Sequence, residues 1–441
     1  MPHSFGNQKL IPHLSAVVFL LLALFLAGCS SQPKIPTPEE QEQKLAEVMN
    51  NGGYNPARKY TIISYQDVWL HDQTQLDIVM TAPTEPGHYP LIIYLPSLGE
   101  NASAGQLWRE TWAQAGYAVF SVQPQAISQA LKEIGQDGRD KPGEPNGDDD
   151  ENDNDSGKDG KHGGKSSRSG RNSEIRFLGH EYFAVDALKS RMEQVYWAYH
   201  QLKMRVASAT PGYASVDNSK VVLAGYDLGA QTVAAILGER FAVSLPKSTE
   251  LNPSAAIVLS PSIDLAEGEV RSRFQNLNMP LLVITGSEDN DPYAISSASV
   301  RSAVWEFSPA NDKYLLLLKG DVHALLAGKE KGGRFGLNNG QGGDKGGFGG
   351  WGGGSKHFQP ANQYGSSGGH GHGQNGGGTG GGHKDDGEHK NADLGYKQVA
   401  AVFSATSAFL DKVLKNDEFA QFWIDEKANN WLDRAGVLKI R

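Results

Sequence analysis

The stretch Lys220-Val-Val-Leu-Ala-Gly-Tyr-Asp-Leu-Gly229 decides the fold, because it joins an apolar strand to a helix through a short turn. After Lys220, its first half is a continuous apolar run, Val-Val-Leu-Ala, typical of a buried strand. The segment Leu228–Gly238 that follows predicts a helix. Gly225 and Gly229 bound the turn, where a missing side chain lets the backbone pass close to neighbouring segments. The pattern therefore predicts a strand, a sharp turn and a helix, with Asp227 at the tip of the turn.

The rest of the core alternates strands and helices. The sequence predicts strands at Pro90–Leu95, Tyr117–Val122, Ala255–Leu259, Leu281–Thr285 and Tyr314–Leu318, and helices at about 104–116 and 181–207. Such alternation indicates an α/β fold, with a mostly parallel sheet and helices on both faces. Ligands of these sheets bind at the carboxyl ends of the strands, so we look for chemistry there.

Two further strand ends carry polar residues. Asp289 and Asp291 follow the strand that ends at Gly286, and His323 follows the strand that ends near Leu318. Together with the turn at Asp227, the order along the chain is nucleophile position, acid, histidine. We expect these side chains to meet at one edge of the sheet.

With these three strand ends in order, the chain resembles the α/β-hydrolase superfamily. The region from Pro90 to about Trp423 is most similar to its dienelactone-hydrolase and acetylhydrolase-like branch. The superfamily carries a G-x-S-x-G turn after a strand, and here Asp stands in place of Ser. The resemblance implies an α/β-hydrolase fold in which Asp227 takes the nucleophile position, Asp289 is the acid and His323 is the base.

The resemblance also implies oxyanion donors. Leu95-Pro-Ser-Leu-Gly99 stands where the superfamily has its oxyanion loop, so the backbone N–H groups of Leu98 and Leu228 are the expected donors. Of the two carboxylates after Gly286, Asp289 is preferred to Asp291 because it lies at the usual offset of three residues.

An aspartate at the turn determines the expected mechanism. A carboxylate that attacks an ester gives a high-energy mixed anhydride, whereas attack on an sp³ carbon gives an alkyl-enzyme ester. His323, oriented by Asp289, would then activate water to hydrolyse that ester. Haloalkane dehalogenases and epoxide hydrolases are similar in using Asp here, although they often carry Trp where this chain has Leu228. We therefore expect a hydrolase for a small organic substrate (an epoxide, a haloalkane or an ester-like compound) that needs no metal or cofactor.

The same exchange of Asp for Ser is compatible with a fold that has lost acyl transfer. The protein would then be a catalytically inactive binding or scaffolding module of the cell envelope. A polysaccharide or cell-wall binding protein is a third class, suggested by location and by aromatic residues alone.

The N-terminus resembles that of a bacterial lipoprotein. Ala16–Ala27 is an apolar run too short to span a bilayer, which needs about 20 residues in a helix, and it matches the core of a signal peptide. Leu26-Ala-Gly-Cys29 resembles a lipobox, which implies that residues 1–28 are removed and that Cys29 is lipidated. Residues 29–56 are interpreted as a tether. Ser30 after the cysteine favours the outer membrane of a Gram-negative cell, with the lipid anchor as the membrane contact.

Two low-complexity inserts interrupt the expected hydrolase domain, residues 57–441. Residues 135–172 are charged and residues 331–390 are glycine-rich, so neither can bury enough apolar surface to offset its ordering entropy, and both are interpreted as disordered. A calcium loop in the first insert is an alternative. So is weak metal binding in the second, by His370, His372, His383 and His389.

Composition excludes several classes of protein. The 441 residues include 53 glycines and one cysteine, and the formal net charge is −9. One cysteine rules out an intramolecular disulfide and a zinc site built from cysteines. The acidic balance argues against a nucleic-acid partner.

Overall fold

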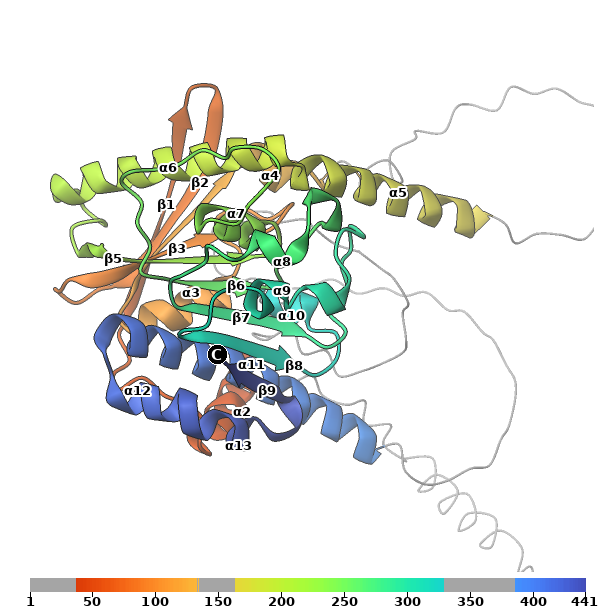
Figure 1. Cartoon of the computed structure of the whole chain (residues 1–441). Coiled ribbons are helices and arrows are strands. Elements are labelled where there is room, and N and C mark those ends of the chain that lie inside the picture. The colour runs from red at the N-terminus through yellow and green to blue at the C-terminus, as the bar shows by residue number, and fades with distance from the viewer. Residues whose placement is uncertain (1–36, 133, 135–162, 329–384) are drawn as a thin grey trace, which may run out of the picture.

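A nine-stranded sheet forms the centre of the protein. The computed structural model describes residues 37–132, 134, 163–328 and 385–441 (Figure 1). The strand order is β1-β2-β4-β3-β5-β6-β7-β8-β9. Strands β4, β3, β5, β6, β7 and β8 pair in parallel, and β1, β2 and β9 add antiparallel at the two sides. The strands are β1 (Ile62–His71), β2 (Thr74–Pro83), β3 (Tyr89–Leu95), β4 (Ala118–Pro124), β5 (Val216–Tyr226), β6 (Ala255–Leu259), β7 (Leu281–Gly286), β8 (Lys313–Leu318) and β9 (Gly436–Ile440).

Helices cover both faces of this sheet, as the sequence predicts. The helices are α2 (Pro38–Asn50), α3 (Gln106–Gln114), α4 (Gln125–Gln129), α5 (Gly163–Phe183), α6 (Val185–Ala207), α7 (Leu228–Ile236), α8 (Val270–Arg273), α9 (Ala303–Glu306), α10 (His323–Leu326), α11 (Asp385–Lys415), α12 (Glu418–Phe422) and α13 (Ala428–Leu432), with short 3-10 turns η2 (Leu265–Glu267), η3 (Ala298–Val300) and η5 (Asp433–Ala435), and a π-helical turn η4 (Trp423–Lys427). The chain is therefore an α/β protein with a mostly parallel sheet.

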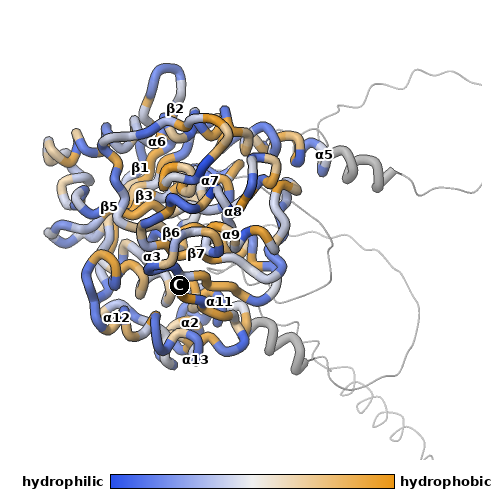
Figure 2. The backbone as a smooth tube through the Cα atoms, in the orientation of Figure 1, coloured by the Kyte–Doolittle hydropathy of each residue, from blue (hydrophilic) through white to orange (hydrophobic). Residues whose placement is uncertain are grey.

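Alternate residues of β3 show how the two layers are built. Ile92 and Tyr94 pack in one apolar cluster with α3 and α11, whereas Leu91 and Ile93 pack in another with α6 and α7. Successive side chains of a strand point to opposite faces, so a central strand that is apolar at every position is covered on both sides. Figure 2 shows the hydrophobic segments concentrated along the central strands.

The tether expected over residues 29–56 is wrong for its second half. Residues 38–50 form helix α2, whose N-terminus carries a capping box between Thr37 and Glu40. Leu45 of this helix and Tyr54 after it are buried against α11. The folded domain therefore begins at about residue 37 rather than 57, because an amphipathic helix in this acidic segment has an apolar side to bury.

The inserts are also shorter than the sequence suggests. Residues 163–172 belong to α5 and residues 385–390 belong to α11, so these parts of the expected disordered segments are helical. Each helix extends from a part that packs against the core, and lengthening an existing helix costs far less than starting one. Residues 135–162 and 331–384 lie outside the described residues. For these residues the interpretation as disordered stays a prediction, and so do the calcium-loop and histidine-metal alternatives.

Candidate active site

The turn between β5 and α7 has the close backbone approach that its glycines predict. A Cβ atom at Gly229 would lie 1.9 Å from the carbonyl oxygen of Leu95, and one at Gly225 would lie 2.5 Å from the carbonyl carbon of Gly229. Asp227 sits between them with φ 51° and ψ −104°, a conformation that a residue with a side chain rarely adopts. Such strain is kept only where the surrounding structure enforces it, and it is concentrated at functional sites.

Two serine hydroxyls hold the carboxylate of Asp227. Ser97, after β3, donates to Oδ2 at 2.6 Å, and Ser262, after β6, donates to Oδ1 at 2.7 Å. The side chain is almost fully buried, with 1% of the residue exposed. Each carboxylate oxygen therefore has a donor, and the group is fixed in one orientation beneath the surface.

Asp289 and His323 form a direct pair. Nδ1 of His323 lies 2.8 Å from Oδ1 of Asp289. The second oxygen of Asp289 accepts hydrogen bonds from Ser260 at 2.5 Å and from Thr285 at 2.6 Å. Asp289 is completely buried, whereas the side chain of His323 is 15% exposed. The carboxylate thus fixes the ring orientation of the histidine and leaves its Nε2 atom for other partners.

The surroundings shift the pKa values of Asp289 and His323 in opposite directions. Burial alone would raise the pKa of Asp289, but the hydrogen bond from His323 and the positive charge of Arg301 outweigh it and lower the pKa to about 2. Burial likewise lowers the pKa of His323, but the hydrogen bond to Asp289 and the charge of Asp227 raise it above 6.5. Because the charge of Asp227 acts on His323, the histidine and the turn belong to one electrostatic site.

Asp291 has a different role from Asp289. Its carboxylate accepts backbone hydrogen bonds from Tyr293 at 2.8 Å, Ile295 at 2.5 Å and Ser296 at 2.6 Å. Burial and the charge of Asp227 raise its pKa. It closes its own loop, and Asp289 is the acid that contacts the histidine.

The two expected oxyanion donors lie beside the turn. Leu98 and Leu228 are both completely buried, and neither backbone N–H donates a hydrogen bond to any residue that the structure describes. Hydrogen bonds fix the loop that carries Leu98. The side-chain amide of Gln123 donates to the carbonyl oxygens of Ser97 at 2.8 Å and Glu100 at 3.1 Å. Both amides are thus available to an oxygen bound at the turn.

Apolar side chains cover this part of the site. They form one cluster, made of Leu98, Ile127, Ile175, Phe183, Leu228 and Tyr293. Ile175 and Phe183 come from α5, and a Cβ atom at Gly179 of the same helix would lie 2.5 Å from the Cβ of Tyr293. Helix α5 therefore packs tightly over the turn, and any ligand there would meet a hydrophobic environment.

Sequence reasoning missed the groups that hold the carboxylates. Ser260 and Ser262 follow strand β6, so the rule that led to the other strand ends would also have found them. Arg301 contacts Asp289 from the turn after η3 and has no comparable signal, because it follows no strand. Among the described residues, no group of three or more His, Cys, Asp or Glu side chains is placed to hold a metal ion.

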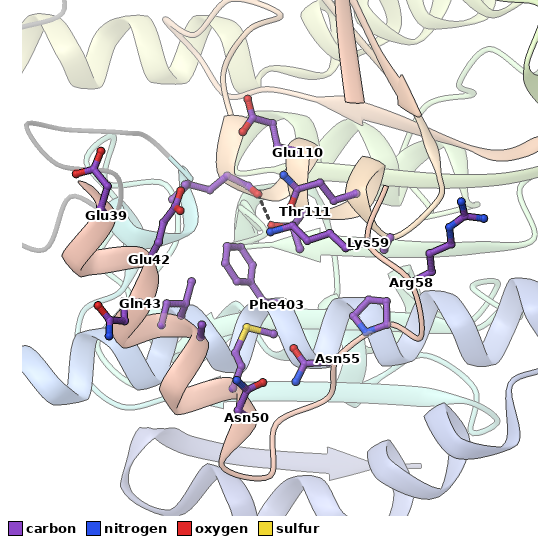
Figure 3. A pocket seen from close by; sticks show the side chains of 17 residues that line it. Glu39, Glu42, Gln43, Asn50, Asn55, Arg58, Lys59, Glu110, Thr111 and Phe403 are labelled. Carbon is purple, nitrogen blue, oxygen red and sulfur yellow. Dashed lines mark hydrogen bonds between the residues drawn. The ribbon is translucent and has the colours of Figure 1, made fainter. Parts of the chain in front are cut away.

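A hollow lies elsewhere on the molecule, lined by other residues than those of the Asp227 site. A groove of about 600 Å³ runs between α2 and α3, with Phe403 of α11 at its base (Figure 3). Glu39 and Glu42 line one side and Arg58 and Lys59 the other, as Figure 3 shows. The described residues that line it include no histidine, so it lacks the base of the site at Asp227.

No protein-family model matches the chain, and no curated protein matches its sequence. The expected signal peptide and the expected lipid anchor at Cys29 both fall in residues 1–36, which lie outside the described part of the chain. Within that part, none of the helices combines the length and apolar character needed to cross a bilayer.

Proposed function

We propose that this protein has an α/β-hydrolase fold and hydrolyses a small apolar organic substrate through a covalent ester at Asp227. The observation that carries the proposal is the strained, buried carboxylate of Asp227 beside an ordered His323–Asp289 pair. The strand order and the positions of the three residues after β5, β7 and β8 support the hydrolase fold. The apolar cover over the turn favours substrates without charge.

The first step forms a bond from a carboxylate oxygen of Asp227 to an sp³ carbon of the substrate. The bond from that carbon to its halide or epoxide oxygen breaks, and the departing atom keeps the electron pair. The hydroxyls of Ser97 and Ser262 hold the carboxylate in place before the attack. The product of this step is an alkyl ester of Asp227, with halide released or an alkoxide that takes a proton from water.

The second step uses His323 as a general base. Nε2 takes a proton from water, and the resulting hydroxide adds to the ester carbonyl carbon. The N–H groups of Leu98 and Leu228 donate to the oxyanion that develops there. The bond to the alcohol oxygen then breaks, and the alcohol receives the proton from His323. Asp227 is left as a carboxylic acid, which loses its proton through His323 to solvent water, and this restores the carboxylate. Asp289 keeps the Nδ1 proton in place throughout.

Turnover assays test this proposal. The purified protein, incubated with haloalkanes, epoxides and activated esters, should release halide or diol, and D227N and H323Q should each lower the rate by at least about 10²-fold. D291N is the matched control, since Asp291 bonds only backbone amides at its carboxylate. Equal rates for wild type and D227N would overturn the proposal.

A non-catalytic binding module is the second candidate. It is favoured by one observation: both oxygens of Asp227 already have serine donors, and only 1% of the residue is exposed. In that case the carboxylate stabilises the turn, and no member of the substrate panel would be consumed. D227N would then lower the thermal stability without any change in chemistry.

We also propose that the chain is lipid-anchored at Cys29 in the cell envelope, in the outer membrane. The sequence around the cysteine supports this location. Helix α2 begins at Pro38, nine residues after Cys29. At 3.3–3.6 Å per residue, the domain would lie no more than about 30 Å from the acyl chains.

A further inference from the structure

Arg301 is a fully buried cation next to the candidate site. It follows η3 and has none of its surface exposed. An arginine of this kind needs several partners, because removing its charge from water is costly. A well-packed apolar side chain of similar volume is often no less stable at such a position, so a buried cation is not explained by stability alone.

The guanidinium joins two strand-end loops of the site. Its Nε donates to the carbonyl oxygen of Asp289 at 3.0 Å, and Nη1 donates to the carbonyl oxygens of Ser260 at 2.7 Å and Pro261 at 3.2 Å. Its Nη1 also donates to the hydroxyl of Ser262 at 3.4 Å. Arg301 therefore bridges the loop after β6 and the loop after β7. Because Ser262 in turn donates to Asp227, Arg301 is linked to the Asp227 carboxylate through a single hydroxyl.

The charge of Arg301 acts on the acid of the His323 pair. Its Nε lies 3.5 Å from Oδ1 of Asp289, the same oxygen that accepts from His323. Its Nη2 is buried and makes no hydrogen bond to the residues that the structure describes. A group retained with one donor unpaired is best explained by its charge, because hydrogen bonding alone leaves it incompletely satisfied.

The charges that face His323 come from several elements. Asp227 lies at the start of α7, Asp289 after β7 and Arg301 after η3. Asp321 accepts a hydrogen bond from the backbone N–H of His323 at 3.2 Å. The ring of Tyr226 lies 5.3 Å from the imidazole. Arg301 is the one cation in this set, and it opposes the carboxylates by lowering the pKa of both Asp289 and His323.

We propose that Arg301 is the positioning residue of this site: it sets the proton affinity of His323 through Asp289 and holds the loops that orient Asp227. Its side chain is fully buried and acts through Asp289 and Ser262. Its charge keeps Asp289 ionised while preventing that carboxylate, together with Asp227, from holding His323 permanently protonated. A histidine that is always protonated could not take a proton from water, so the proposal deepens and rests on the function proposed above.

The titration of His323 tests the proposal without any substrate. In the full chain labelled with ¹⁵N histidine, the imidazole signals are followed by NMR against pH, and H323Q identifies the signal of His323. We expect R301M to raise the His323 midpoint, by about one pH unit, because Arg301 lies 3.5 Å from the Asp289 oxygen that His323 contacts and its charge lowers the pKa of the histidine. R301K keeps the charge and should stay close to the wild-type midpoint.

Arg273 supplies a matched control. It is a second buried arginine, on α8, bound to Glu239 rather than to the site. R273M should lower the thermal stability as R301M does and leave the His323 titration unchanged. If R301M does not fold, R301Q gives the same comparison with a hydrogen-bonding neutral side chain.

An unchanged His323 midpoint in R301M or R301Q would overturn the proposal, as would an equal shift in R273M. Because the readout needs no turnover, it separates the two proposals. A shifted midpoint in a protein that consumes no substrate would refute the hydrolase and leave the role of Arg301 intact. Turnover of substrate together with an unmoved His323 midpoint would support the hydrolase and refute the role of Arg301.

Discussion

At the scale of single residues, the site depends on carboxylates that stay charged while buried. Asp289 is the extreme case, because it has no exposed surface and yet receives donors from Ser260, Thr285 and His323. A carboxylate with several donors keeps its charge at low pH. The stability of the fold is therefore linked to the ionisation of this one group.

D289N should change how stability depends on pH. The pKa of Asp289 is about 2 in the folded chain and 3.8 for a free side chain, so its ionisation stabilises the fold above pH 3.8 by about 2 kcal/mol. That contribution is lost as the pH falls through about 2. Urea unfolding between pH 5 and pH 2 should therefore show a loss in wild type that is about 2 kcal/mol larger than in D289N.

Asp186 is the control for this measurement, because its side chain is 90% exposed and pairs only with Lys189 on the surface. D186N should follow the wild-type curve. If D289N also follows it, Asp289 is not ionised in the way the geometry indicates.

The positions of the three polar residues could be predicted from the sequence, because each directly follows an apolar strand. The contacts that hold their side chains could not. Ser97 and Arg301 approach from loops 130 and 12 residues away from the carboxylates they contact. Only the packing of the sheet brings such loops together, and no local pattern records it.

At the scale of elements, the turn between β5 and α7 depends on two glycines that leave no room for a side chain. G229A should be severely destabilising, by roughly 3 kcal/mol or more, because its Cβ would overlap the backbone of Leu95 and Pro96. The free energy of unfolding, measured by chemical denaturation, checks this.

Gly320 provides the comparison for G229A. Its φ of +82° also disfavours a side chain, but nothing lies within 4 Å of a Cβ atom there. G320A should lower the free energy of unfolding by only about 1 kcal/mol, the usual effect of a side chain in the left-handed region. Equal losses in the two variants would show that the close approach at Gly229 does not constrain the turn.

Helix α2 makes a prediction about where the folded domain begins. Leu45 is buried against the core, so L45A should lower the free energy of unfolding by about 2–3 kcal/mol. E47A changes an exposed residue of the same helix and should have little effect. If L45A matches E47A in denaturant unfolding, residues 38–50 behave as the tether first expected.

The strands with continuous apolar runs, β3 to β8, could be predicted because burial on both faces leaves a plain signal. The outer strands could not. Strand β1 has mostly exposed residues, and β9 is five residues long with one buried residue, Leu438. Edge strands bury little surface of their own, so their sequences carry little apolar pattern.

At the scale of the whole molecule, the proposed anchor and the proposed site are independent. C29S should move the protein from the membrane fraction to the soluble fraction of a cell lysate, because it removes the acceptor thiol. S31A, two residues away, should stay with the membranes. Intact mass of the mature protein would show the added acyl groups, and a C29S variant that still sediments with membranes would contradict the anchor.

The central claim is that Asp227 forms a covalent ester, and trapping it is the most direct measurement. Without its base, H323Q should stall after the first step, so intact and peptide mass analysis after exposure to epoxides, haloalkanes and activated esters should reveal one adduct on the peptide that contains Asp227. The double variant D227N/H323Q should stay unmodified. An adduct at another residue, or an H323Q protein that remains unmodified across a panel that wild type also leaves intact, would contradict the account.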